Sequence, residues 1–246
     1  MTERIQKILS QQGYCSRRAA DRLIEQGRVK INGRIASIGD RMDVASDVIA
    51  VDNQRVFTRR RVEKHYYMLN KPRGYVTTLH DRHAKKDVAS LVEDIGVRLF
   101  PVGRLDKDSE GLLLMTNDGS FANMISHPSH GITKSYRVSV KPAADEQQLS
   151  ELASGVELDG MLTVPVSVLV TAEDAEKTVF EMTLKEGKNR EVRRLCEAVG
   201  LVVVRLKRTA IGPLRLAALP SGKYRELTKQ ELTALFAAGS KAGVKR

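Results

Sequence analysis

The sequence predicts an α+β protein of two domains, and three features of its 246 residues support this. The first 60 residues combine helix-period apolar spacing with an Asn-Gly hairpin turn. A basic run at residues 58–61 is followed by an apolar, strand-like stretch at 65–70. A third feature, at 112–115, is an apolar run that follows a polar, Gly-bounded loop. We therefore expect domains over residues 1–60 and 61–236, and a flexible basic tail over 237–246.

The chain is strongly basic, with 41 Lys and Arg against 30 Asp and Glu, a net charge of +11. Residues 1–61 hold 13 of the basic and 7 of the acidic residues, about half of the excess. Such a balance favours a polyanionic partner, although many metabolic enzymes are also basic. The sequence has no apolar stretch of about 18 residues for a membrane span, and its charged start lacks the apolar core of a signal peptide. We expect a cytoplasmic protein without a membrane partner.

The first 60 residues predict two helices followed by a β-hairpin. Ile5, Ile8 and Leu9 have helical spacing, and Gly13 is a suitable stop. Ser16 is a good N-cap for a second helix, which Gly27 ends. Strand-like alternation then surrounds Asn32-Gly33, a strong hairpin turn.

Basic side chains are spread over this small domain. The second helix and the hairpin supply five candidate RNA-binding residues: Arg17, Arg18, Arg22, Lys30 and Arg34. Cations on a rigid surface contact the phosphates of RNA and recognise its shape more than its base sequence. The string CSRRAADRLIEQGRVKINGR, residues 15–34, resembles the S4-like (alpha-L) RNA-binding domain. That resemblance covers nearly all of residues 2–50 and implies contact with structured RNA.

The strongest candidate for chemistry is the polar loop of residues 103–111, GRLDKDSEG, which precedes the apolar run at 112–115. A loop of this kind before a buried strand places Asp106 at the edge of a sheet. A calcium loop is disfavoured because its twelfth position is Asn117 instead of Glu. A phosphoryl-transfer aspartate is disfavoured because the strand follows the acids instead of preceding them. A surface ion pair remains the simplest alternative for an isolated aspartate.

The longer string decides against that alternative. GRLDxxSxGLLLxTND, from residue 103 to residue 118, resembles the signature of the RsuA/RluB/RluF-type pseudouridine synthases of ribosomal RNA. Three further segments resemble other motifs of that family: residues 70–74 (NKPRG), 134–138 (KSYRV) and 186–195 (EGKNREVRRL). The resemblance covers residues 3–235 and implies a catalytic domain with a mixed, mostly antiparallel sheet. It also implies isomerisation of uridine to pseudouridine, which conserves atoms and needs no cofactor or metal.

The resemblance assigns roles to four catalytic candidates. Asp106 is the carboxylate that either attacks the ribose carbon or removes a ribose proton, and both roles require its ionised form. Arg193 is the cation expected beside it. Tyr136 is expected to stack on the extruded uracil, and Arg104 to fill the gap in the RNA helix or hold a nearby phosphate.

The third motif also predicts a helix from its own spacing. Asn189 is a suitable N-cap, and Val192, Leu195, Cys196 and Val199 form an apolar face. Arg193 lies at the border of that face. Two arginines that point outward and a preceding lysine are candidate phosphate contacts: Arg190, Arg194 and Lys188.

Other chemistry-bearing residues have simpler interpretations. His127 and His130 have the spacing of two metal ligands, but Pro128 between them and the lack of a third ligand nearby favour a turn. Cys15 and Cys196 are predicted to be small structural residues. The basic run at 58–61 is predicted to be a linker that contacts RNA.

The function that these observations favour is site-specific pseudouridine formation in 23S ribosomal RNA by a monomeric enzyme. Two alternatives act on related partners: a 16S ribosomal RNA synthase of the RsuA type, and a non-catalytic ribosome-associated factor on the same scaffold. A metal-dependent phosphotransfer enzyme is a third alternative. Asp106 distinguishes an active enzyme from the non-catalytic factor, because a scaffold without activity does not need this carboxylate.

Overall fold

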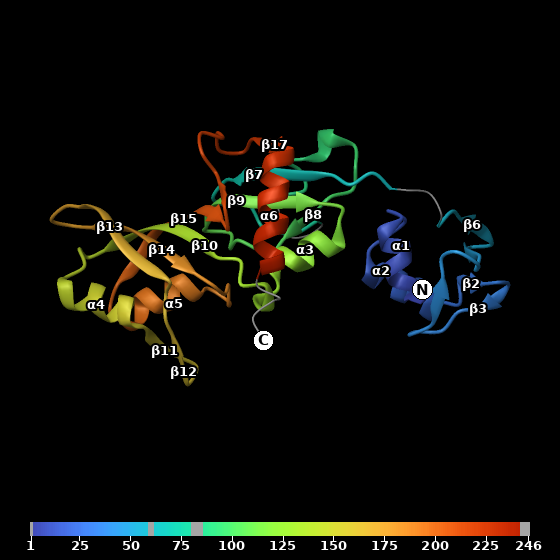
Figure 1. Cartoon of the computed structure of the whole chain (residues 1–246), viewed down its shortest axis with the longest axis horizontal. Helices are drawn as coiled ribbons and strands as arrows, with labels where there is room; N and C mark the ends of the chain where they lie inside the picture. Colours follow the sequence, from blue (N-terminus) through green and yellow to red (C-terminus); the bar gives the residue numbers. More distant parts are fainter. Residues whose placement is uncertain (1, 59–61, 80–85, 242–246) are drawn as a thin grey trace. The chain divides into compact units, whose positions relative to one another are not determined.

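Two helices and short strands form the N-terminal unit of the computed structural model, which describes residues 2–58, 62–79 and 86–241 (Figure 1). Its elements are β1 (Thr2–Arg4), α1 (Ile5–Gln11), α2 (Arg17–Glu25), β2 (Val29–Ile31), β3 (Arg34–Ile35), β4 (Arg41–Asp43), β5 (Ile49–Val51) and β6 (Gln54–Val56). The Ser16 hydroxyl accepts a hydrogen bond from the Ala19 amide at 3.1 Å and caps α2. Asn32 and Gly33 both have positive φ, as a tight hairpin between β2 and β3 requires. Both predicted helices and the hairpin are confirmed.

The chain divides into two units. One holds Met1–His65 with Asn117–Gly119, and the other holds Tyr66–Thr116 and Ser120–Arg246. The domain boundary expected after residue 60, and the basic run proposed as a linker, fall at residues 59–61, outside the described residues.

The second unit is organised by one large sheet. Its strands are β7 (Tyr66–Lys71), β8 (Phe100–Val102), β9 (Glu110–Thr116), β10 (Lys134–Lys141), β13 (Ser167–Glu173), β14 (Thr178–Leu184), β15 (Val202–Ile211), β16 (Leu214–Arg215) and β17 (Tyr224–Glu226). The order is β13-β14-β10-β15-β9-β7-β17, with β16 beside β15 and β8 beside β9. Within the described residues every pair in this sheet is antiparallel except β9 with β15. The predicted α+β class with a mixed, mostly antiparallel sheet is confirmed.

The second unit also contains helices and a small hairpin. They are α3 (Gly119–Ser126), α4 (Glu146–Ser154), α5 (Glu191–Ala198), α6 (Lys229–Lys241), the short 3-10 helices Glu93–Ile95 and Pro128–His130, and the hairpin β11 (Val156–Leu158) with β12 (Met161–Thr163), which contacts α5. In Figure 1, α4 and α5 lie together beneath β13 and β14, whereas α3 and α6 lie near β8 and β9. No helix in the described part of the chain combines the length and the apolarity that crossing a membrane requires.

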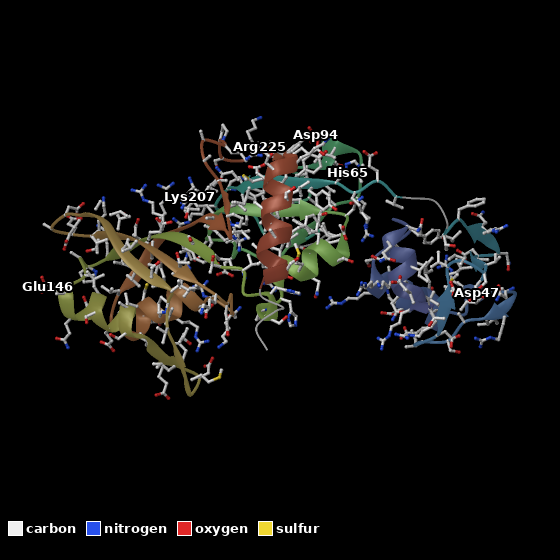
Figure 2. The ribbon with its side chains drawn as sticks, in the orientation of Figure 1. Asp47, His65, Asp94, Glu146, Lys207 and Arg225 are labelled. Atoms are coloured by element: carbon white, nitrogen blue, oxygen red, sulfur yellow. The ribbon has the colours of Figure 1, made fainter. Side chains whose placement is uncertain are left out.

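Strand β9 separates two hydrophobic cores. Leu112 and Leu114 pack with α3 and α6, while Leu113 and Met115 pack with the cluster that includes α4 and α5. A strand buried on both faces has a continuous apolar sequence instead of an alternating one, as the run at 112–115 shows. Strands β10 and β15 alternate instead, so that Lys207 projects on the side of the sheet away from α5 (Figure 2).

Two local predictions are wrong. The expected tail over 237–246 begins too early, because α6 continues to residue 241. Gly239 is buried there, and its missing side chain leaves room for Met124. Asn189 does not cap α5: the N-cap position is Arg190, in the left-handed region at φ 49°, and the Glu191 carboxylate accepts the Lys188 amide instead. Residues 242–246 lie outside the described residues.

Candidate active site

The loop between β8 and β9 holds Asp106 through its neighbours. Leu105 is buried, and the Thr77 hydroxyl both donates to the Leu105 carbonyl at 2.6 Å and accepts from the Leu105 amide at 3.2 Å. The Ser109 amide donates to the Asp106 carbonyl at 3.1 Å. The backbone of the loop is therefore fixed, while the Asp106 side chain stays 28% exposed and lines a pocket.

A buried lysine holds this loop by hydrogen bonds to its backbone. Lys71, at the end of β7, is fully buried, and its ammonium donates to the carbonyls of Asp106 at 2.9 Å, Ser109 at 2.7 Å and Pro72 at 3.2 Å. Burial lowers the pKa of Lys71 to about 8, and the charge of Asp106 opposes that shift. Lys71 lies within the NKPRG motif, but sequence reasoning assigned it no role. A lysine at the end of an apolar strand was the available signal.

Gly111 sets how closely β9 approaches β15. Its φ is +105°, and an added Cβ would lie 2.3 Å from the Arg208 carbonyl oxygen. Only glycine fits here, where Arg208 and Gly111 are direct partners in the parallel ladder. The side chain of Arg208 then lies beside Arg104, and one of its terminal nitrogens donates to the Arg104 carbonyl at 3.4 Å.

The cation beside Asp106 differs from the one expected. Arg190 lies 3.7 Å from the Asp106 carboxylate and 3.6 Å from that of Asp108. Arg193 instead pairs with Asp108 at 2.9 Å and donates to the Val203 carbonyl at 2.9 Å. Arg193 is at the border of the buried helix face, as predicted, but its direct partner is Asp108. Arg190, predicted to point outward, turns toward the acids because its left-handed backbone redirects the side chain.

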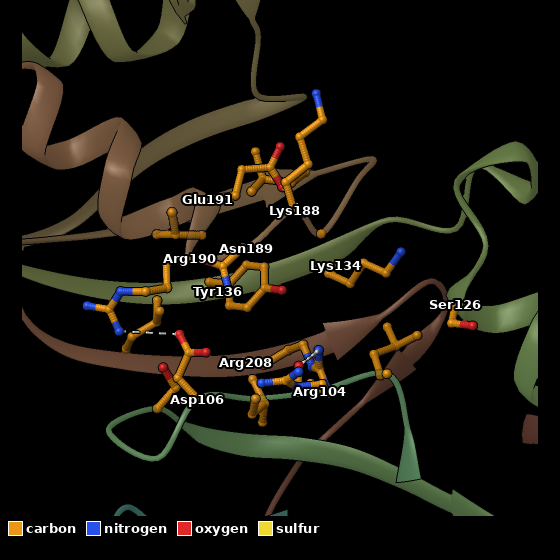
Figure 3. Close-up of a pocket in the computed structure, with 18 of the residues that line it drawn as sticks. Arg104, Asp106, Ser126, Lys134, Tyr136, Lys188, Asn189, Arg190, Glu191 and Arg208 are labelled. Atoms are coloured by element: carbon orange, nitrogen blue, oxygen red, sulfur yellow. Dashed lines mark hydrogen bonds and ion pairs between the residues drawn. The ribbon is translucent and has the colours of Figure 1, made fainter. Parts of the chain in front are cut away.

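Asp106 opens onto a pocket of about 380 Å³. Tyr136, on β10 and only 7% exposed, forms part of its wall, and exposed Arg104 lies at its rim. Figure 3 shows Asp106 and Arg190 on one side of Tyr136 and Lys134 on the other. The pocket therefore brings Asp106, Tyr136, Arg104 and Arg190 together, as a site that holds one flat ring against an acid requires.

The remaining predicted cations have different surroundings. Lys188 is at the pocket but pairs with Glu186 at 3.1 Å, and in Figure 3 its amine points away from the other residues drawn. Arg194 forms a two-pronged ion pair with Asp159, at 2.6 and 2.9 Å, outside the pocket.

The cations of the N-terminal unit are also placed by the structure. The three arginines of α2 are exposed: Arg17, Arg18 and Arg22. Lys30 donates to Asn53 at 3.0 Å, and Arg34 pairs with Asp40 at 2.9 Å while remaining largely exposed. All five are therefore on the surface of this unit, where phosphates can reach them.

Residues set aside in the sequence behave as structural groups. His127 caps the short helix Pro128–His130, in the turn that was predicted after α3. Cys196 is fully buried, and burial raises the pKa of its thiol to about 12. The described residues contain no group of three or more His, Cys, Asp or Glu side chains that could hold a metal ion.

Comparison with known proteins identifies the family. The RNA pseudouridylate synthase family matches residues 65–198, a range that includes the Asp106 loop, Tyr136 and α5, and the S4 domain matches residues 3–49. The chain belongs to the RNA pseudouridylate synthase family. The resemblance seen in the sequence is thereby confirmed, and the protein is a pseudouridine synthase with an N-terminal S4 domain.

Relatives of this synthase match along most of its length. The ribosomal large subunit pseudouridine synthase B of Bacillus subtilis is 39% identical over 237 residues, 96% of each chain. The dual-specificity RNA pseudouridine synthase RluF of Escherichia coli K12 is 39% identical over 233 residues, 95% of this chain and 78% of that protein. A crystal structure of a pseudouridylate synthase matches with a TM-score of 0.65 and 31% identity, over 94% of this chain and 99% of that one.

Proposed function

We propose that this synthase isomerises specific uridines of 23S ribosomal RNA to pseudouridine, with Asp106 as the catalytic carboxylate. The observation that carries the proposal is the position of the Asp106 carboxylate, at a ring-sized pocket lined by Tyr136 and 3.7 Å from Arg190. A cation at that distance favours the negative charge that either role of Asp106 requires.

The reaction breaks the bond between ribose C1′ and uracil N1 and forms a bond between C1′ and uracil C5. The electron pair of the broken bond leaves with the uracil ring. Asp106 either attacks C1′ or removes a ribose proton, and the sugar later returns to its original state. After the ring has turned, C5 bonds to C1′, the C5 proton is lost, and N1 regains a proton. Atoms and electrons balance without a redox partner.

The other pocket residues position the substrate. A uridine in folded RNA must be extruded before a protein can reach its glycosidic bond. Tyr136 offers an aromatic face to the extruded ring, a contact worth about 1–3 kcal/mol per base in single-strand binders. Arg104 is exposed at the rim, where it can enter the vacated position in the RNA or hold a flanking phosphate. Arg193 acts through Asp108, whose carboxylate it holds at 2.9 Å.

The choice of ribosomal RNA rests on the S4 domain and on the relatives. The exposed arginines of α2 suit the backbone of structured RNA. One relative is named for the ribosomal large subunit, which favours 23S over 16S ribosomal RNA. Lys188 and Arg194 are proposed as phosphate contacts once RNA displaces their present ion pairs with Glu186 and Asp159, whereas Arg190, which was also predicted to contact phosphate, stays beside Asp106 in this proposal. The monomeric state and the cytoplasmic location belong to the same proposal.

Pseudouridine mapping tests this function. Cells lacking the protein are rescued with the wild type, with Asp106→Asn, or with the control Asp174→Asn, an exposed aspartate in the β13–β14 turn. We expect at least one 23S pseudouridine to disappear on deletion and to return with the wild type and the control only. A deletion that removes no pseudouridine, or restoration by Asp106→Asn, would refute the proposal.

A further inference from the structure

Arg208 is a buried cation in the pocket that the proposed catalytic roles do not use. It is only 4% exposed; its Nε donates to the Leu112 carbonyl at 2.8 Å and one terminal nitrogen donates to the Arg104 carbonyl at 3.4 Å. Its other terminal nitrogen, Nη2, is buried without a hydrogen-bond partner within the described residues. Leaving a buried N–H group unpaired is energetically unfavourable, so the site favours a ligand that accepts a hydrogen bond there.

Lys134 brings a second cation to the same pocket. It lies on β10 two residues before Tyr136, is only 8% exposed, and has no ion pair or side-chain hydrogen bond within the described residues. Burial lowers the pKa of Lys134, and the nearby charge of Arg208 lowers it further. The buried Glu191 and, to a smaller extent, Glu186 offset part of this positive charge. Two cations thus remain close together where no carboxylate binds either of them directly.

The position of this pair relative to Asp106 suggests its ligand. Tyr136, the proposed stacking surface, lies between Asp106 and Lys134 in the pocket (Figure 3), and Arg208 is the direct strand partner of Tyr136. A uracil ring against Tyr136 with its ribose toward Asp106 would present its far edge to the two cations. That edge carries the two carbonyl oxygens, O2 and O4, on either side of the N3–H group, and these oxygens accept hydrogen bonds.

We propose that Lys134 and Arg208 bind the carbonyl oxygens of the detached uracil and stabilise the negative charge it carries. The inference rests on the proposed function and deepens it. When the C1′–N1 bond breaks, its electron pair stays on uracil, and the charge spreads over N1 and the two carbonyl oxygens. This holds whether Asp106 attacks C1′ or removes a ribose proton. The charge disappears when C5 bonds to C1′ and N1 regains a proton.

The same pair accounts for the choice of uracil over cytosine. Cytosine keeps the C2 carbonyl but has an amino group where uracil has the C4 carbonyl, so the cation at that position would face hydrogen-bond donors. A site whose buried donors lose their acceptor rejects the wrong ligand strongly. Fixed donors aimed at developing charge are worth about 10²–10³ in rate each.

Single-turnover kinetics with enzyme in excess test the proposal. The variants are Lys134→Met and Arg208→Lys; Arg208→Lys keeps a cation while losing the fork. The control is Lys207→Met, which removes a neighbouring charge from the opposite face of β15. For Lys134→Met we expect RNA affinity within threefold of the wild type and a rate constant about 10²–10³-fold lower. Thermal unfolding verifies that each variant is folded, and Lys207→Met should keep the wild-type rate.

A better leaving group distinguishes charge stabilisation from a structural role. Fluorine at C5 stabilises a negative charge on the detached ring, so consumption of a 5-fluorouridine target should be slowed at most about tenfold by Lys134→Met. The proposal is overturned if the loss is equal on both RNAs, or if neither variant slows the reaction. It is also overturned if a variant lowers RNA affinity and the salt dependence of that affinity but leaves the single-turnover rate constant at saturating enzyme unchanged. That result would show that the side chain contacts a phosphate. If the wild type forms no pseudouridine, the proposed function fails and this inference fails with it.

Discussion

Replacing Lys71 by methionine should slow the reaction without weakening RNA binding. The change keeps the length and the apolar stem of the side chain and removes the ammonium that joins the Asp106, Ser109 and Pro72 carbonyls. These three bonds join the end of β7 to the loop that holds Asp106. Because Lys71 is completely buried, RNA cannot reach it directly.

The expected cost follows from two opposing contributions. Hydrogen bonds from a charged group contribute about 1.5–3 kcal/mol each, and the variant removes all three. Holding the charge in this site costs about 3 kcal/mol, as the lowering of the Lys71 pKa from 10.5 to about 8 indicates, and methionine avoids that cost. The net destabilisation is therefore about 1.5–6 kcal/mol. A loop displaced by about 1 Å lowers the rate about 10²-fold.

Single-turnover pseudouridine formation and RNA binding measure this effect, with thermal unfolding to verify the fold. The control is Lys223→Met, at an exposed lysine of the same unit. We expect Lys71→Met to bind RNA within threefold of the wild type and to react about 10²-fold more slowly. A wild-type rate, or a loss confined to RNA affinity, would show that Lys71 does not position Asp106.

Three further predictions concern other parts of the chain. Replacing Gly111 by alanine should destabilise the protein by at least about 2 kcal/mol in urea unfolding, because the new Cβ would lie 2.3 Å from the Arg208 carbonyl; a stable variant would contradict the close approach. The Arg225 partner lowers the pKa of Glu231 to about 2, so the pair stabilises the fold above pH 4.5 and the effect fades as the pH falls toward 2. Glu231→Gln should remove about 1–2 kcal/mol of this acid-sensitive stability, discounted for partial exposure, and an unchanged pH profile of unfolding would refute it. Changing the three α2 arginines, Arg17, Arg18 and Arg22, to glutamine should weaken RNA binding. The slope of the logarithm of the binding constant against the logarithm of the salt concentration should become shallower by up to about 0.9 for each phosphate that is no longer neutralised. An unchanged slope would show that α2 does not bind RNA.

Local features of the fold were predictable from the sequence. The Ser16 cap and the Asn32-Gly33 turn each depend on residues within a few positions of one another. Such features follow from the conformational preferences of a few neighbouring residues. The apolar run at 112–115 predicted a buried strand by its own composition, although the residues that pack against it are distant in the sequence. The order of residues around Asp106 identified the family for the same reason, because a motif is a local property.

Features that depend on long-range contacts were not predictable in this way. Lys71 reaches a carbonyl 38 residues away, and Arg208 reaches one 96 residues away. Helix spacing placed Arg193 correctly at the edge of a buried face, but which acid it meets depends on the loop at 106–108. No sequence pattern predicts the left-handed backbone conformation of Arg190, so the direction of its side chain toward Asp106 is known only from the structure.

The central claim is that Asp106 drives uridine isomerisation in large-subunit RNA. Its most direct test incubates the purified protein, in excess, with unmodified 23S ribosomal RNA and maps pseudouridine along the RNA. We predict nearly complete conversion of one or a few uridines by the wild type, and none by Asp106→Asn at equal RNA occupancy. Conversion by Asp106→Asn at the wild-type rate, or no conversion by the wild type, would contradict the claim.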